Sequence, residues 1–87
     1  MIPQKITERF TETPLDDELV LMNIETGQFN TLKNTGLAIW QLIDGKSDTA
    51  SIKAKMAETH NVAADRCSAE VDHFLAELQE AGFVKIA

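Results

Sequence analysis

The chain has 87 residues, 44% hydrophobic and 25% charged, which predicts one soluble globular domain over residues 1–87 rather than a disordered chain. Its 14 acidic residues outnumber the 8 basic ones, giving a net charge of -6. An acidic domain repels a phosphate backbone, so we expect no nucleic acid partner and favour a basic peptide or protein surface.

The cysteine count and the N-terminus bear on the compartment. One cysteine, Cys67, cannot form an internal disulfide, which fits a reducing, cytoplasmic setting. The segment Met1 to Phe10 lacks the apolar region of a signal peptide, and no apolar run is long enough to cross a bilayer. We therefore expect a cytoplasmic protein without membrane contact.

The first stretch of the chain predicts a strand and a turn. Residues Ile6 to Thr11 alternate weakly and predict a short strand. Pro14, Asp16 and Asp17 then mark a turn or loop.

A β-hairpin is predicted over Glu18 to Leu32. Glu18 to Ile24 is an apolar run too short for a typical helix, which predicts a strand covered on both faces. Glu25-Thr26-Gly27 suits a hairpin connection with a G1 bulge, because glycine accepts the positive φ required there. Gln28 to Leu32 is the returning strand.

Two helices are predicted next. The first runs from Asn34 or Thr35, either of which can cap it, to Asp44, with Gly45 as the left-handed residue that ends it. The second runs from Thr49, its predicted cap, to about His60. Its apolar stripe is Ile52 and Met56.

The third helix has the clearest pattern, from about Asp65 to Ala81. Its apolar residues recur at helical spacing, and Gly82 ends it: they are Cys67, Val71, Phe74 and Leu78, with Leu75 beside them. The apolar tail from Phe83 to Ile86 is expected to pack back or to add a strand. The whole order predicts an α+β, winged helix-turn-helix-like fold, with an N-terminal three-stranded antiparallel sheet followed by three helices.

No constellation of catalytic residues stands out, so we expect no enzyme, no cofactor and no metal. Trp40 lies between apolar neighbours and is assigned to the core. Cys67 lies on an apolar stripe and is assigned as a buried structural thiol. His60 and His73 are too far apart in sequence for a local metal motif.

The segment from Glu25 to Ile52 resembles the PqqD-like family, also called RiPP recognition elements, where RiPP denotes a ribosomally made, modified peptide. The matching residues are Thr26, Gly27, Phe29, Leu32, Thr35, Gly36, Ile39, Trp40, Leu42, Asp44, Gly45, Thr49 and Ile52. The C-terminal matches are Val71, Phe74, Leu75, Leu78 and Gly82. The resemblance extends from about Asp17 to Val84.

Departures from the family pattern bear on the pathway. The family often has Asn where this chain has Lys33, and Glu25-Thr26-Gly27 replaces the Pro-Glu turn of the pyrroloquinoline-quinone branch. The chain is therefore more similar to stand-alone members that serve lasso-peptide or related systems.

The resemblance implies a non-catalytic, leader-peptide-binding peptide chaperone. In this family the leader of a precursor peptide adds as a strand beside the third strand, against the third helix. The implied contact residues are Gln28, Phe29, Asn30, Thr31 and Leu32 with Arg66, Glu70, His73, Phe74 and Glu77. The implied partners are the leader peptide and a leader protease, cyclase or radical tailoring enzyme. The protein itself is expected to be a monomer or a strand-exchanged dimer.

The charge of the third helix sharpens this expectation. Its exposed residues include one basic side chain, Arg66, and five acidic ones: Asp65, Glu70, Asp72, Glu77 and Glu80. We infer that the peptide or enzyme carries basic residues. A plain solvated face accounts for the pattern equally well. Phe29 is assigned either to the groove or to the core.

Three other functions stay open. They are a peptide chaperone for pyrroloquinoline quinone synthesis, a winged-helix DNA-binding regulator, and a small enzyme or carrier. A DNA reader needs Lys or Arg on its recognition helix, and the third helix here has the opposite sign. A carrier needs a modifiable serine, and Ser47, Ser51 and Ser68 lie in no recognisable motif.

Overall fold

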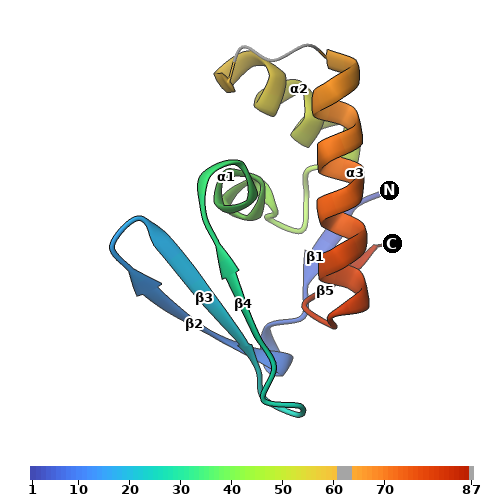
Figure 1. The fold of residues 1–87 in the computed structure, drawn as a ribbon. Coiled ribbons are helices and arrows are strands. Elements are labelled where there is room, and N and C mark those ends of the chain that lie inside the picture. Colours follow the sequence, from blue (N-terminus) through green and yellow to red (C-terminus); the bar gives the residue numbers. More distant parts are fainter. Residues whose placement is uncertain (61–63, 87) are drawn as a thin grey trace.

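The computed structural model describes residues 1–60 and 64–86, with only the backbone of residues 60, 64 and 65. Two small sheets and three helices surround one core (Figure 1). The strands are β1 (Pro3–Lys5), β2 (Phe10–Leu15), β3 (Glu18–Asn23), β4 (Phe29–Leu32) and β5 (Val84–Ile86). The helices are α1 (Asn34–Leu42), α2 (Thr49–His60) and α3 (Ala64–Glu80), with a 3-10 turn, η1, at Thr7–Arg9.

The predicted three-stranded antiparallel sheet is present in the order β2-β3-β4. The predicted first strand at Ile6 to Thr11 is wrong over its first four residues, because η1 occupies Thr7–Arg9 and β2 begins at Phe10. Pro14 lies within β2 rather than in the turn, which is made by Asp16 and Asp17. An edge strand accepts proline where its nitrogen faces away from the neighbouring strand.

The predicted hairpin over Glu18 to Leu32 is confirmed, with the returning strand starting at Phe29 instead of Gln28. Gly27 has φ 74° and donates its N–H to the Asn23 carbonyl, while Asn23 donates to the carbonyl of Gln28. These two bonds define the expected G1 bulge. The bulge fixes which backbone groups of β4 face β3.

The helices lie where predicted, but their starts and stops differ. α1 has Lys33 as its N-cap and no side-chain cap, so neither Asn34 nor Thr35 caps it. It ends at Leu42, before Asp44, and the left-handed Gly45 follows two residues after the C-cap Ile43.

Two aspartates accept backbone hydrogen bonds in the connection between α1 and α2 and at the start of α2. Asp48, not Thr49, caps α2 by accepting the Ser51 N–H at 2.8 Å. Asp44 accepts the N–H groups of Ser47 and Lys46 at 2.7 and 2.8 Å. These backbone bonds lower the pKa of both carboxyls below the usual 3.8.

The end of α3 supports the predicted role of Gly82. Gly82 has φ 86° and donates to the Gln79 carbonyl, and Phe83 donates to the Leu78 carbonyl. This is the Schellman pattern that ends a helix. The tail then forms β5, which pairs antiparallel with β1, so the expected added strand is present.

The core lies between the helices and the inner face of the three-stranded sheet. Trp40 is 1% exposed, as predicted, and Phe10 packs edge-on against both Trp40 and Phe83. The Trp40 indole donates to Glu12 at 2.7 Å, and the Lys5 ammonium lies 4.4 Å from its ring centre. The pKa of Lys5 is lowered, because burial of its ammonium outweighs the neighbouring carboxylates of Glu12 and Asp44, which raise it.

Candidate peptide-binding groove

The β4 edge of the three-stranded sheet is open. β4 pairs with β3, and no strand in residues 1–60 and 64–86 pairs with its other side. Because Asn23 bonds to Gln28 and pairing alternates along an antiparallel ladder, Asn30 and Leu32 face β3 with their backbone groups. The N–H and C=O groups of Phe29 and Thr31 therefore point outward from the sheet.

α3 forms a second wall opposite this edge (Figure 1). Three hollows lie in series along β4, the start of α1 and α3, with volumes of about 380, 310 and 230 Å³. The first two share Asn30 and Glu77, and the last two share Phe74. We call this continuous feature the groove. Its wall residues are Gln28, Phe29, Asn30, Thr31, Leu32, Thr35, Gly36, Ile39, Glu70, His73, Phe74, Glu77, Leu78, Glu80 and Ala81.

The chemistry of the groove changes along its length. Glu77 and Glu80 make the end near the hairpin acidic. The other end has the half-buried Phe74 against Ile39 and Gly36, and a Cβ on Gly36 would lie 3.1 Å from Cε1 of that ring. A glycine therefore lets α1 approach α3 closely at this point. The groove combines an apolar recess, an acidic end and unpaired main-chain groups.

Most of the residues predicted from sequence meet in this groove. Arg66 lines none of the three hollows, and its Nε lies 3.5 Å from Glu70 Oε1. His73 is exposed, with Nε2 2.7 Å from Glu77 Oε1. Phe29 is 65% exposed, so the alternative that places it in the core is wrong.

Several groove residues were not predicted: Thr35, Gly36, Ile39, Leu78, Glu80 and Ala81. Glu80 lies three residues after Glu77, and Leu78 lies four residues after Phe74. Helical spacing from these two predicted residues could therefore have found them. Thr35, Gly36 and Ile39 belong to the groove because α1 packs near α3, and local pattern does not reveal that contact.

Asn23 is a further residue that sequence reasoning missed. It is the single buried polar side chain in the described core, at 7% exposure. Its Oδ1 accepts the N–H groups of Glu25 and Thr26 at 2.9 and 3.2 Å, and its Nδ2 donates to the Ala81 carbonyl at 3.1 Å. Asn23 therefore ties the β3–β4 turn to the end of α3, beside the hollow that Gln28 and Ala81 line.

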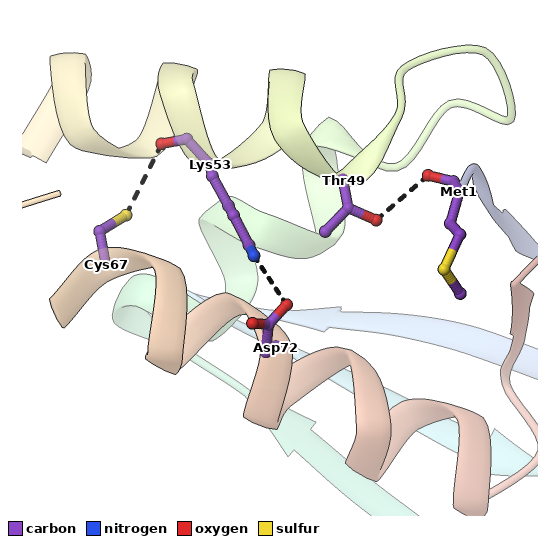
Figure 2. Close-up of polar contacts among 5 residues, drawn as sticks. All are labelled: Met1, Thr49, Lys53, Cys67 and Asp72. Atoms are coloured by element: carbon purple, nitrogen blue, oxygen red, sulfur yellow. Dashed lines mark hydrogen bonds and ion pairs between the residues drawn. The ribbon is translucent and has the colours of Figure 1, made fainter. Parts of the chain in front are cut away.

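Contacts on the opposite side of α3 hold this helix against α2 (Figure 2). Lys53 Nζ lies 2.9 Å from Asp72 Oδ1, and Cys67 Sγ lies 3.7 Å from the Lys53 carbonyl. Cys67 is buried, as expected for a structural thiol. A hollow of about 430 Å³ lies here, lined mainly by α2 and α3. Among the described residues, no three His, Cys, Asp or Glu side chains are grouped to hold a metal.

The model of the family described as coenzyme PQQ synthesis protein D (PqqD) matches residues 18–84. The chain belongs to the PqqD family. That match includes β4, α1 and all of α3, the elements that build the groove.

The fold is also that of a solved structure, TbiB1 in complex with the TbiA(beta) leader peptide. The two share 23% identity with a TM-score of 0.84, over 97% of this chain and 98% of that chain. This agreement confirms the predicted α+β, winged-helix-like fold. No curated protein sequence matches the chain significantly. No helix in the described residues is long and apolar enough to cross a membrane.

Proposed function

We propose that this protein is a non-catalytic recognition element that binds the leader of a ribosomally made precursor peptide in the groove and presents it to a modifying enzyme or leader protease. The single observation that carries the proposal is the outward-facing backbone of Phe29 and Thr31 opposite α3. An extended peptide adds to such an edge through main-chain bonds, and pockets take its alternate side chains. The leader-bound structure of TbiB1, which has the same fold, supports this proposal.

The pathway is the finer part of the proposal. The Glu25-Thr26-Gly27 turn favours a lasso-peptide-type system. The family description favours the alternative, a peptide chaperone for pyrroloquinoline quinone synthesis. The two differ in the leader, so binding of one labelled leader in preference to the other decides between them.

Thr31→Pro tests strand addition directly. It removes the outward N–H while leaving the bonds of Asn30 and Leu32 to β3 in place. Without this N–H, a carbonyl of the bound peptide is left without a hydrogen-bond donor. We therefore expect affinity to fall about tenfold or more. The measurement is fluorescence anisotropy with a labelled leader peptide, for which the TbiA(beta) leader of the matched structure is the first probe.

Thr31→Ala is the matched control, because it shortens the same side chain and keeps the N–H. We expect its affinity to stay within about threefold of wild type, because an exposed side chain contributes little. Equal affinities for Thr31→Pro and Thr31→Ala, with both variants folded by circular dichroism, would remove strand addition at β4 from consideration.

A further inference from the structure

The hollow at the hairpin end of the groove has a lining unlike that of the other two groove hollows. It has a volume of about 380 Å³ and is lined by Gln28, Asn30, Glu77, Glu80 and Ala81. Its lining contains carboxylates and side-chain amides, and no residue in it is basic or aromatic. We call this feature the hairpin-end hollow. It offers many hydrogen-bond acceptors and a negative charge to whatever enters it.

The hairpin-end hollow lies at the C-terminal end of α3, where negative charge is unfavourable for the helix. α3 ends at Glu80, so Glu77 and Glu80 lie in its last turn, and no basic residue does. The end carbonyl groups of a helix carry partial negative charge, so a cation there stabilises the helix and an anion destabilises it. Departures of this kind from a locally favourable sequence occur at functional sites. The end of α3 thus lacks the cation that its electrostatics favour.

Glu80 is the carboxylate that is left to bind such a cation. Other carboxylates of α3 already have a partner; the pairs are Asp72 with Lys53, Glu70 with Arg66, and Glu77 with His73. Among the side chains that the structure describes, no Lys, Arg or His lies within ion-pair distance of Glu80. The charge that complements the hairpin-end hollow therefore comes from a bound molecule.

The acceptors of the hairpin-end hollow suit a guanidinium better than an ammonium group or a metal ion. A guanidinium is planar and has five N–H donors, whereas an ammonium group has three. Carboxylate and amide oxygens spread around a hollow can satisfy several of these donors together. In the described part of the chain, no three His, Cys, Asp or Glu side chains are grouped to hold a metal. An arginine side chain is the cation that fits this set.

The length of the groove indicates where in the leader this arginine lies. The helix rise between Phe74 and Glu80 is about 9 Å, and an extended strand covers that distance in roughly three residues. Side chains of an added strand face the groove at every second residue. The arginine is therefore about two or four residues from the leader side chain that occupies the recess at Phe74.

We propose that the hairpin-end hollow is an arginine subsite of the groove, and that Glu80 determines its preference for arginine. This inference rests on the proposed function and narrows the substrate class to leaders that carry an arginine at this distance from their apolar anchor. Main-chain bonds to β4 hold the leader in either case, so the arginine selects among leaders that already fit the open edge.

A positional scan of the labelled TbiA(beta) leader tests the subsite. Each position in turn carries arginine or citrulline, which has a similar shape without the charge, and affinity is measured by fluorescence anisotropy. For the wild-type domain we expect a position at which arginine binds about fivefold or more tighter than citrulline. In Glu80→Gln, which keeps the side-chain length, we expect this ratio to fall to about twofold or less, with the affinity of the citrulline leader unchanged.

Glu58→Gln, exposed on α2, removes the same charge away from the groove and should keep the wild-type ratio. Glu80→Gln removes an anion from the end of α3, so its Tm should not fall, and lost folding cannot account for a lost preference. A scan without an arginine preference, or a preference that Glu80→Gln retains, overturns the arginine subsite and leaves the proposed function in place. If the wild-type domain binds no leader of the scan, the proposed function itself is overturned.

Discussion

The two edges of the three-stranded sheet differ in how they meet solvent. On β2, the bond from Ile24 N–H to the Arg9 carbonyl sets the alternation, so the backbone groups of Phe10, Glu12 and Pro14 face outward. Of these, Pro14 has no N–H and Glu12 carries a charge. On β4 the outward positions are Phe29 and Thr31, with neither proline nor charge.

This difference separates protection from function. Proline and charged side chains are the means by which natural sheets prevent unwanted pairing at an edge. β2 has both, and β4 has neither. The unprotected edge is also the one that α3 faces across the groove, so an incoming strand gains a second wall there. An open edge that coincides with a groove is the arrangement expected of a peptide-binding edge.

The largest effect is expected from removing the Asn23 side chain, whose hydrogen bond to the Ala81 carbonyl we call the tether between the β3–β4 turn and α3. Asn23→Ala deletes the bonds to Glu25, Thr26 and the Ala81 carbonyl. Because it removes three hydrogen bonds made by a buried side chain, we expect the free energy of unfolding to fall by about 2 kcal/mol and leader affinity to fall with it. Urea denaturation and anisotropy measure the two effects.

Asn23→Asp separates the turn from the tether. The carboxylate keeps the acceptor for Glu25 and Thr26 but cannot donate to Ala81. We expect this variant to lose leader affinity as well. Wild-type affinity in Asn23→Asp would mean that the bond to α3 does not set the groove.

A smaller effect is expected from the acidic end of the groove. Glu80→Lys reverses one charge beside Gln28 and Glu77, and we expect a leader with Lys or Arg at this end to bind about two- to tenfold more weakly. Glu58→Lys, exposed on α2, makes the same change of net charge away from the groove and is the control. The difference between the two variants should shrink as salt is raised. Equal effects would assign the acidic end to solvation alone.

Local pattern predicted those elements whose signals are local. The hairpin, its Gly27 bulge, the stop at Gly82 and the extent of α2 are confirmed because turn glycines and apolar spacing act over a few residues. The prediction of the first strand was wrong because its signal is not local. Its position depends on the pairing of β2 with β3 and of β1 with β5, which brings distant segments together.

The groove was predictable in outline and not in detail. Its strand and helix came from the family resemblance. The tether from Asn23 to Ala81 spans 58 residues and leaves no local signal. The close approach of Gly36 to Phe74 likewise depends on how α1 packs. The predicted contact Arg66 lies outside the groove hollows, because helical spacing alone does not fix how far along a helix a groove extends.

The smallest effect is expected at the protected edge, and it tests the comparison most directly. Pro14→Thr restores the one outward N–H that β2 lacks, so that every outward position on both edges has a donor. We expect leader affinity to stay within about twofold and the stoichiometry to stay at one leader per domain, because main-chain bonds alone bind weakly without a second wall. Stability should change by less than about 1 kcal/mol, mainly through the more flexible unfolded chain. Titration calorimetry measures the stoichiometry. A second leader bound to Pro14→Thr would mean that an unpaired edge suffices for binding and that the opposing helix is dispensable.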